Sequence, residues 1–392
     1  MKPALATLAL AAATGAMVSA AVAQEAPRPG PAAEEVHPTA PVDAAEARRT
    51  ATSLAAILEE NYVFPDVARR YAEALRTKAS AGAYDTLGSA GALADRLTDD
   101  LRAVSPDNHL RVMPGPAGDG PMVRVVRAPP GAAPPGAGPQ PRRIRMPAGP
   151  PVEDARRIAP GIAYVRLNLF PGDSETIEAV RRFMADNADA KTLIFDIRTH
   201  RGGGLAEMDA IFPYLFAAQT SLVRMDTRTS VAHRHANPMG ERATVRPVPT
   251  DEDVVRTEHI AIPSASEKRL FGAKVFVLTS NLSGSAAEHF ALALKRTGRA
   301  TLIGETTAGA GNYGGMRPIG ERFSAFVPVG RTFDPDTGKG WEGTGVAPDV
   351  RVPANQALVE ALVRSGLARA EAERIAGATG PQGPFTRPVP RS

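Results

Sequence analysis

Residues Val275–Glu288 read VFVLTSNLSGSAAE: an apolar, β-branched run ends in a polar turn, and a helix of small residues follows. Ser285 stands where the turn meets the helix. A serine in this place can lie exposed on a tight turn, beside the backbone N–H groups of the helix N-terminus. The letters S-A-A-E also match a capping box, in which Ser and Glu satisfy backbone donors. This segment alone favours the cap, so a chemical role for Ser285 needs partners elsewhere in the chain.

Strands and helices alternate on both sides of this segment. Between about Phe216 and Val275 the sequence looks irregular, and elsewhere the periodicity indicates definite elements. The expected strands are 161–170, 192–198, 275–279, 300–304 and 323–329, and the expected helices are 174–187, 202–216, 285–296 and one or two over 356–376. Alternation of this kind predicts βαβ units and a largely parallel sheet, so the fold class is α/β.

The N-terminus has the features of an export signal. Lys2 precedes an Ala/Leu-rich apolar stretch, and Ala21–Ala23 forms an A-x-A cleavage site. We therefore expect a periplasmic or secreted protein. The predicted segments are a signal peptide (1–23), a disordered lead-in (24–43), a small helical domain (44–112), a Pro/Gly-rich linker (113–157), a core domain (158–354), C-terminal helices (355–376) and a disordered tail (377–392).

Composition narrows the possible functions. The chain has no cysteine, which excludes thiol catalysis and cysteine-based metal sites. Its net charge is only +4, and its arginines are scattered without a basic stripe, so nucleic acid is not an expected partner. No segment after the signal has the unbroken apolar length to span a bilayer, so stable membrane insertion is not expected. The oligomeric state is left open.

Two glycine-rich segments are candidate parts of a site. Gly202–Gly204 follow a predicted buried strand, where parallel α/β sheets bind ligands, and glycine lets backbone N–H groups approach a substrate oxygen. An N–H here and that of Ala286 could form an oxyanion hole, although the glycines also suit a simple tight turn. Gly309–Gly314 matches G-x-G-x-x-G but leads into a turn and strand, so we expect a substrate groove with Gly309 and Gly311 rather than a dinucleotide site.

Histidines are the candidates for a general base. His289 lies one helical turn after Ser285, so spacing alone makes it a rival. His200 neighbours the glycine-rich turn. His109 is remote in sequence, and spacing cannot test it. A single histidine of this kind more often has a structural role.

Five stretches resemble the tricorn-type and interphotoreceptor retinoid-binding protein-like branch of the C-terminal-processing serine peptidases. They are SPDNHLRV (105–112), GIAYVRLNLF (161–170), TLIFDIRTHRGGG (192–204), residues 275–314, and FVPVGRTFDPDTGKGWEGTGVAPDV (326–350). The resemblance implies a crotonase-like core of ββα units. It places Ser285 at the nucleophile, Ala286 and Gly203 at the oxyanion hole, His109 at the general base and Glu342 at the carboxylate of the tetrad.

The chain departs from the family pattern in two places. The processing branch carries a catalytic lysine 25 residues after the serine, and here that residue is Ala310. The Ser–His version is therefore favoured. Tricorn has a serine before its histidine, where this chain has Asn108, whose amide could relay a hydrogen bond between Glu342 and His109.

The leading hypothesis is an exported serine peptidase that uses Ser285, His109 and Glu342 and needs no metal or cofactor, with a peptide or protein as substrate. Two alternatives remain: a non-hydrolytic binding protein for hydrophobic ligands on the same fold, and an esterase that uses the same residues.

Overall fold

The computed structural model describes residues 37–116, 149–234, 242–380 and 385. The expected signal peptide, the first part of the lead-in and most of the Pro/Gly-rich segment lie outside these residues. Within them, no helix combines the length and the apolar character that a membrane span requires.

A six-stranded sheet forms the centre of the core, as the alternating elements predicted. Its strands run in the order β12 (Val350–Arg351), β9 (Thr301–Gly304), β8 (Lys274–Thr279), β4 (Thr192–Asp196), β3 (Ile162–Leu167) and β2 (Val152–Ala159). All neighbours pair in parallel except β2 with β3. β2 lies at the edge, begins before the expected core, and is largely exposed, so its sequence carries no apolar alternation.

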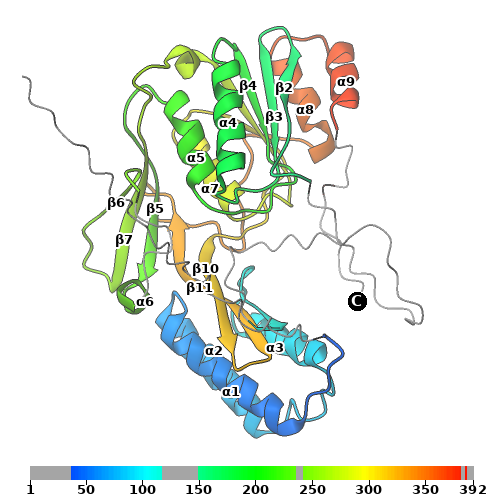
Figure 1. Ribbon diagram of the computed structural model, residues 1–392, viewed down its shortest axis with the longest axis vertical. Helices are drawn as coiled ribbons and strands as arrows, with labels where there is room; N and C mark the ends of the chain where they lie inside the picture. The colour runs from blue at the N-terminus through cyan, green and yellow to red at the C-terminus, as the bar shows by residue number, and fades with distance from the viewer. Residues whose placement is uncertain (1–36, 117–148, 235–241, 381–384, 386–392) are drawn as a thin grey trace, which may run out of the picture. The chain divides into compact units, whose positions relative to one another are not determined.

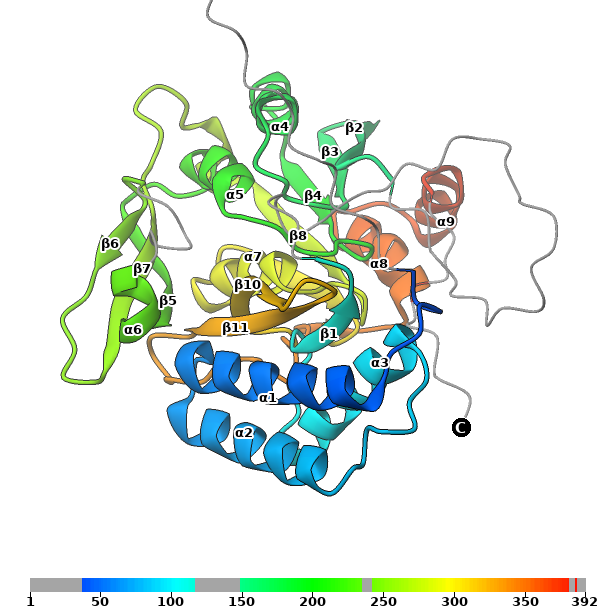
Figure 2. The same cartoon turned by 60° about the horizontal axis from the view of Figure 1, so that its bottom comes forward.

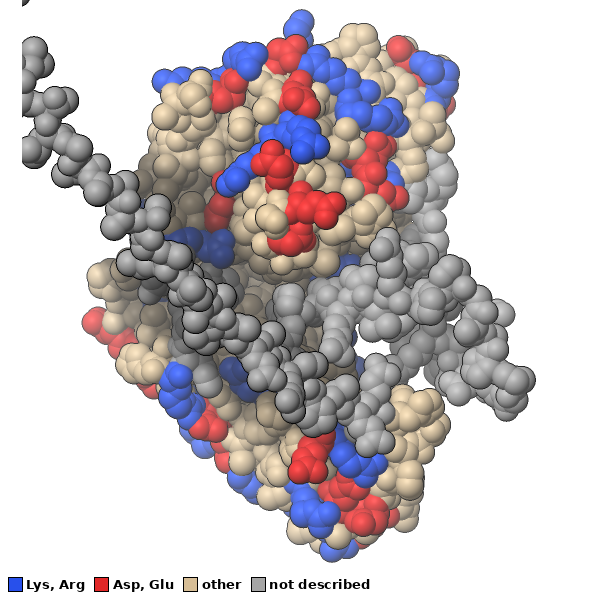
Figure 3. Space-filling model, viewed as in Figure 1, with Lys and Arg blue, Asp and Glu red and all other residues tan. Residues whose placement is uncertain are grey.

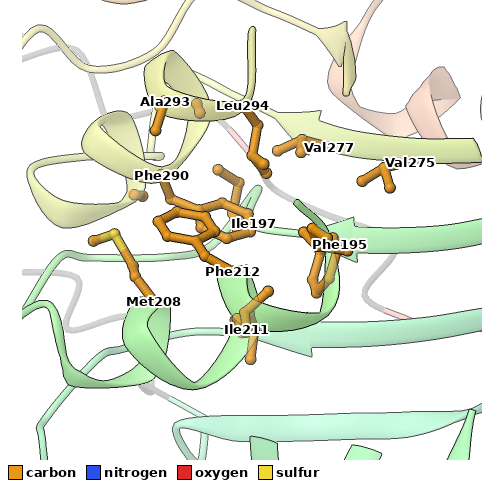
Figure 4. Packing of buried hydrophobic residues seen from close by; sticks show 14 of the residues in the cluster. Phe195, Ile197, Met208, Ile211, Phe212, Val275, Val277, Phe290, Ala293 and Leu294 are labelled. Carbon is orange, nitrogen blue, oxygen red and sulfur yellow. The ribbon is translucent and has the colours of Figure 1, made fainter. Parts of the chain in front are cut away.

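Helices cover both faces of this sheet (Figure 1). One face packs against α4 (Ser174–Asp186), α5 (Ala206–Ile211) and α7 (Ala286–Arg296), and the other against α8 (Ala357–Arg364) and α9 (Arg369–Ala378). Figure 4 shows the first layer, where Val277 of β8 lies by Phe290 and Leu294 of α7. Phe290 stacks on Phe212 with ring centroids 5.5 Å apart.

A second, antiparallel sheet was not predicted. It runs β1 (Arg111–Pro114), β11 (Phe323–Phe333), β5 (Thr220–Arg228), β7 (Val254–Ala261) and β6 (Val245–Pro247), and β10 (Asn312–Ile319) also pairs with β11. The sequence between Phe216 and Val275 looked irregular because charged residues on β5 and β7 pair with each other. Asp226 of β5, for example, accepts from Arg256 of β7 at 2.6 Å.

The N-terminal region is helical, as expected, with α1 (Ala44–Asn61), α2 (Pro65–Ser80) and α3 (Ala90–Val104). Asp43 caps α1 by accepting from the N–H of Glu46 at 2.7 Å. The apolar faces of these helices pack on β11 through Phe323, Ala325 and Val327 (Figure 2). The remaining short elements are α6 (Thr229–Arg234) and 3₁₀ turns at Phe212–Tyr214, Arg269–Gly272 and Ala354–Gln356.

The C-terminal end is more ordered than the sequence suggested. The helix α9 continues to Ala378, two residues past its expected end. Beyond it, Phe385 is buried with its ring 4.4 Å from the guanidinium carbon of Arg198.

On the face shown in Figure 3, Lys and Arg lie among Asp and Glu and do not gather into one basic patch.

Candidate active site

Ser285 occupies a strained turn between β8 and α7. Its φ is 60°, and among the described residues it is the one non-glycine residue with positive φ. The turn is tied to the end of β4: Ser280 Oγ donates to the carbonyl of Arg198 at 2.5 Å, and Ser283 Oγ donates to that of Ile197 at 2.8 Å. These two bonds hold the strained residue at the carboxyl end of the parallel sheet.

The S-A-A-E segment begins α7 with the reciprocal contacts that its sequence predicted. The N–H of Ser285 donates to Glu288 Oε2 at 2.8 Å, as a capping box requires. The N–H of Glu288 donates to the carbonyl of Ser285, also at 2.8 Å.

The glycine-rich turn lies directly against Ser285. A Cβ placed on Gly202 would be 2.8 Å from Ser285 Cβ and 3.2 Å from Oγ. Gly203 has φ +126°, and a Cβ there would be 2.0 Å from the carbonyl oxygen of Phe170. Among the described residues, the N–H groups of Gly203 and Ala286 have no hydrogen-bond acceptor. Two donors of this kind beside a serine suit the binding of a developing oxyanion.

A cavity of about 310 Å³ opens beside Ser285. Its walls are mostly apolar, and its lining includes Gly203, Ala286 and Gly311 of the predicted site together with His289 and Trp341. Gly309, the other predicted groove residue, is not part of this lining. Its N–H instead donates to Glu288 Oε1 at 2.6 Å.

The segment around His109 is held by Asp107. One carboxylate oxygen of Asp107 accepts from the N–H groups of His109 and Leu110, at 2.9 and 3.0 Å. The other accepts from Tyr62 Oη and Asn312 Nδ2, both at 2.9 Å. The segment is thereby fixed to α1 on one side and to β10 on the other.

Glu342 comes together with this segment across 234 positions of sequence. Its Oε1 accepts from the N–H of Asn108 at 2.7 Å, and its Oε2 accepts from the N–H groups of Gly311 and Asn312 at 2.6 and 2.9 Å. Potential ligand atoms of Asp107, His109 and Glu342 lie within 4.8 Å of one another. Backbone and side-chain donors already occupy both carboxylates, so the group suits positioning of the imidazole better than a metal cage.

The Asn108 side-chain amide does not bond to Glu342, as a relay between Glu342 and His109 would require. It donates to the carbonyl of Gly309 at 2.7 Å, and Asn108 reaches Glu342 through its backbone N–H. Burial raises the pKa of Glu342 to about 7, and the charge of Asp107 adds to the rise, while the three N–H donors oppose it.

Two histidines near Ser285, His200 and His289, are buried. Desolvation lowers the pKa of His200 to about 3, and its Nδ1 accepts the N–H of Gly202 at 3.0 Å, so it supports the glycine-rich turn. His289 lines the cavity, but its Nε2 contacts His259 Nδ1 at 2.8 Å. Sequence reasoning missed His259, because it lies in the segment that looked irregular, and it missed Trp341, because a lone tryptophan carries no positional signal.

Two protein-family models match this chain. Residues 161–352 match the family model described as peptidase family S41, and residues 44–135 match the one described as the N-terminal domain of peptidase S41 in eukaryotic IRBP. The structure of a putative peptidase from Parabacteroides merdae aligns with a TM-score of 0.52 at 19% identity, over 83% of this chain and 98% of that one. This likeness supports the fold.

Two further solved structures are similar over part of their length. The photosystem II D1 C-terminal processing protease aligns with a TM-score of 0.34 at 24% identity, over 49% of this chain and 42% of its own. The tricorn protease aligns with a TM-score of 0.49 at 14% identity, over 86% of this chain and 37% of its own. This chain therefore spans less than half the length of either protein.

Proposed function

Because the chain belongs to peptidase family S41, a family of serine peptidases, we propose that it hydrolyses peptide bonds with Ser285 as nucleophile and His109 as general base. The observation that carries the proposal is the contact of the glycine-rich turn with Ser285, because it sets two N–H donors beside the Ser285 hydroxyl.

The mechanism follows from these positions. Ser285 Oγ attacks the peptide carbonyl while His109 takes its proton, and the N–H groups of Gly203 and Ala286 stabilise the oxyanion. Glu342 stabilises the imidazolium, and Asn108 holds Glu342 in place through its backbone N–H. The imidazolium then protonates the leaving amine, and water, deprotonated by the same base, releases the acyl group from Ser285.

We also propose that the chain acts outside the cytoplasm, as the N-terminal signal indicates. The substrate would then be a peptide or an exported protein. The expected segment boundaries, with a helical domain at 44–112 and a core domain at 158–354, are part of the same proposal. Fractionation of cells that express the full chain tests it, since the processed protein should begin at Gln24 and leave the cytoplasm.

The proposed chemistry is tested with purified chain and a mixture of internally quenched peptides. Ser285→Ala and His109→Ala should each lower kcat/KM by at least about 10³-fold. Ser80→Ala on α2 and His233→Ala on α6 alter exposed residues of the same types and serve as controls. Equal turnover by all variants would overturn the assignment.

A fluorophosphonate probe separates the competing functions. The probe should label the wild type and spare Ser285→Ala, because it reacts only with an activated serine. A protein that binds hydrophobic ligands without labelling would instead be a binding protein. Labelling with ester turnover but no peptide turnover would indicate an esterase.

A further inference from the structure

A chain of four polar groups, of which the two histidines are buried, ends at the cavity beside Ser285. Arg242 Nη1 donates to Asp209 Oδ2 at 2.8 Å, and Asp209 Oδ1 lies 3.0 Å from His259 Nε2. His259 Nδ1 lies 2.8 Å from His289 Nε2. His259 is fully buried, and His289 is 4% exposed and lines the cavity. The mechanism proposed above uses none of these four residues.

The surroundings of this chain of contacts set the charges at its two ends. Burial works to raise the pKa of Asp209, but hydrogen bonds from His259 and Arg242 outweigh it and keep the carboxylate ionised. Burial holds the pKa of His289 well below its ordinary value, so this ring is neutral and can form a hydrogen bond through each of its two nitrogens.

Among the described residues, the only hydrogen-bond partner of the His289 ring is His259, which it contacts through Nε2, so its Nδ1 is left for a ligand. His289 and Ser285 both line the cavity. A substrate residue whose carbonyl is at Ser285 would extend its side chain into this cavity. The remaining walls are largely apolar, with Leu169, Phe170, Leu205 and Trp341 among them.

We propose that this cavity receives the side chain on the acyl side of the scissile bond, and that His289 selects neutral side chains that form hydrogen bonds, such as glutamine or threonine. This inference rests on the proposed peptidase function. An aliphatic side chain of equal size would leave the buried Nδ1 of His289 unpaired, which is a cost of the kind that gives specificity. A lysine or arginine would bring its charge beside Arg242, which also lines the cavity.

Matched substrates test the preference. Peptides that differ only in glutamine against methionine, or threonine against valine, compare side chains of similar size. The wild type should favour the polar member of each pair by about tenfold or more in kcat/KM. His289→Leu should bring the ratio close to one, and His289→Gln, which keeps a hydrogen-bonding group, should retain part of it. His233→Leu, the same change at an exposed histidine, should leave the ratio as in the wild type.

A binding assay separates this inference from the peptidase function. Trp341 is the single tryptophan of the chain and lines the cavity, so its fluorescence reports occupancy. Titration of Ser285→Ala with acetyl-Ala-Ala-Gln and acetyl-Ala-Ala-Met should show tighter binding of the first. This result without any cleavage by the wild type would keep the cavity proposal and overturn the peptidase function. Cleavage without preference, a preference that survives His289→Leu, or no fluorescence change with either peptide would overturn the cavity proposal.

Discussion

Glu288 holds the backbone N–H of Ser285 at 2.8 Å with one oxygen of a carboxylate that is itself fully buried. The same oxygen accepts from the N–H of Ala310 at 2.8 Å, and the other oxygen accepts from Thr307 Oγ1 and the N–H of Gly309, both at 2.6 Å. The Glu288 side chain therefore joins the turn that holds Ser285 to the segment that precedes β10.

Replacing Glu288 by glutamine should impair both stability and activity. The amide would turn an NH₂ group toward backbone donors, and each buried donor left unpaired costs about 1–3 kcal/mol. We expect a lower free energy of unfolding in urea and a kcat at least about tenfold lower. Glu371→Gln, on the exposed side of α9, is the matched control. A Glu288→Gln enzyme with the stability and kcat of the wild type would contradict the role given to this carboxylate.

Gly203 and Gly204 should respond differently to the same substitution. Alanine at Gly203 meets the Phe170 carbonyl at 2.0 Å and a φ that alanine rarely adopts, so the glycine-rich turn must move away from Ser285. Alanine at Gly204 meets its nearest neighbour at 3.9 Å. We expect kcat/KM to fall about 10²-fold or more in Gly203→Ala and to change little in Gly204→Ala. Similar activities of the two variants would exclude an oxyanion role for this turn.

Glu342 should give the activity a pH dependence near neutrality. Its pKa of about 7 means that the folded protein keeps this proton until near-neutral pH. Because the proposed mechanism uses an ionised Glu342 to stabilise the His109 imidazolium, kcat/KM should rise with pH around a midpoint of about 7. Glu342→Gln should lower kcat/KM by about 10²–10⁴-fold and move this step. A wild-type profile that is flat from pH 5 to 8 would contradict the prediction.

The same carboxyl should affect folding with the opposite sign. Between its ordinary pKa of 4.5 and about 7, the folded state binds a proton that the unfolded chain has released. The contribution of Glu342 to the free energy of unfolding therefore falls as pH rises through this range. Urea unfolding of the wild type and Glu342→Gln at pH 5 and pH 8 measures this contribution. If the difference in free energy of unfolding between the two proteins is the same at both pH values, the contribution is absent.

Asp196 should be a strong determinant of stability at the end of β4. Its carboxylate is fully buried and accepts from Arg198 Nη2 at 2.7 Å and from Tyr164 Oη at 2.6 Å. Removal of its charge would leave the buried guanidinium of Arg198 without this counter-charge. Asp196→Asn should cost about 3–5 kcal/mol in urea unfolding. Asp189→Asn breaks an exposed ion pair with Arg157 and should cost less than about 1 kcal/mol. Equal costs would show that burial does not set the value of the pair.

The sequence predicted the elements whose apolar residues follow a local periodic pattern. The strand β8, the turn and α7 follow directly from an apolar run and small residues, and the N-terminal helices follow from their spacing. In the antiparallel sheet, β11 was expected as a strand at 323–329, but β5 and β7 escaped prediction. Cross-strand ion pairs such as Asp226 with Arg256 join these two strands and leave no periodic apolar pattern.

The site divides in the same way. Ser285 and the glycine-rich turn 202–204 could be proposed as candidates from local pattern, since each follows a buried strand, whereas the choice of Gly203 came from resemblance. His109 and Glu342 could be proposed only by resemblance, because 234 positions separate Asn108 from Glu342 and no spacing rule spans such a distance. The contacts of His289 with His259 depend on the register of β7, which the sequence did not reveal.

The hydrogen bond between Glu342 and the N–H of Asn108 also has a consequence for biosynthesis. A growing chain that has passed Ser285 but not yet reached position 342 contains the proposed nucleophile and base but lacks the carboxylate that holds the segment of His109. Hydrolytic capacity would then arise only when synthesis is nearly complete. If the chain crosses a membrane before it folds, this order of events would protect the proteins of the cell that makes it.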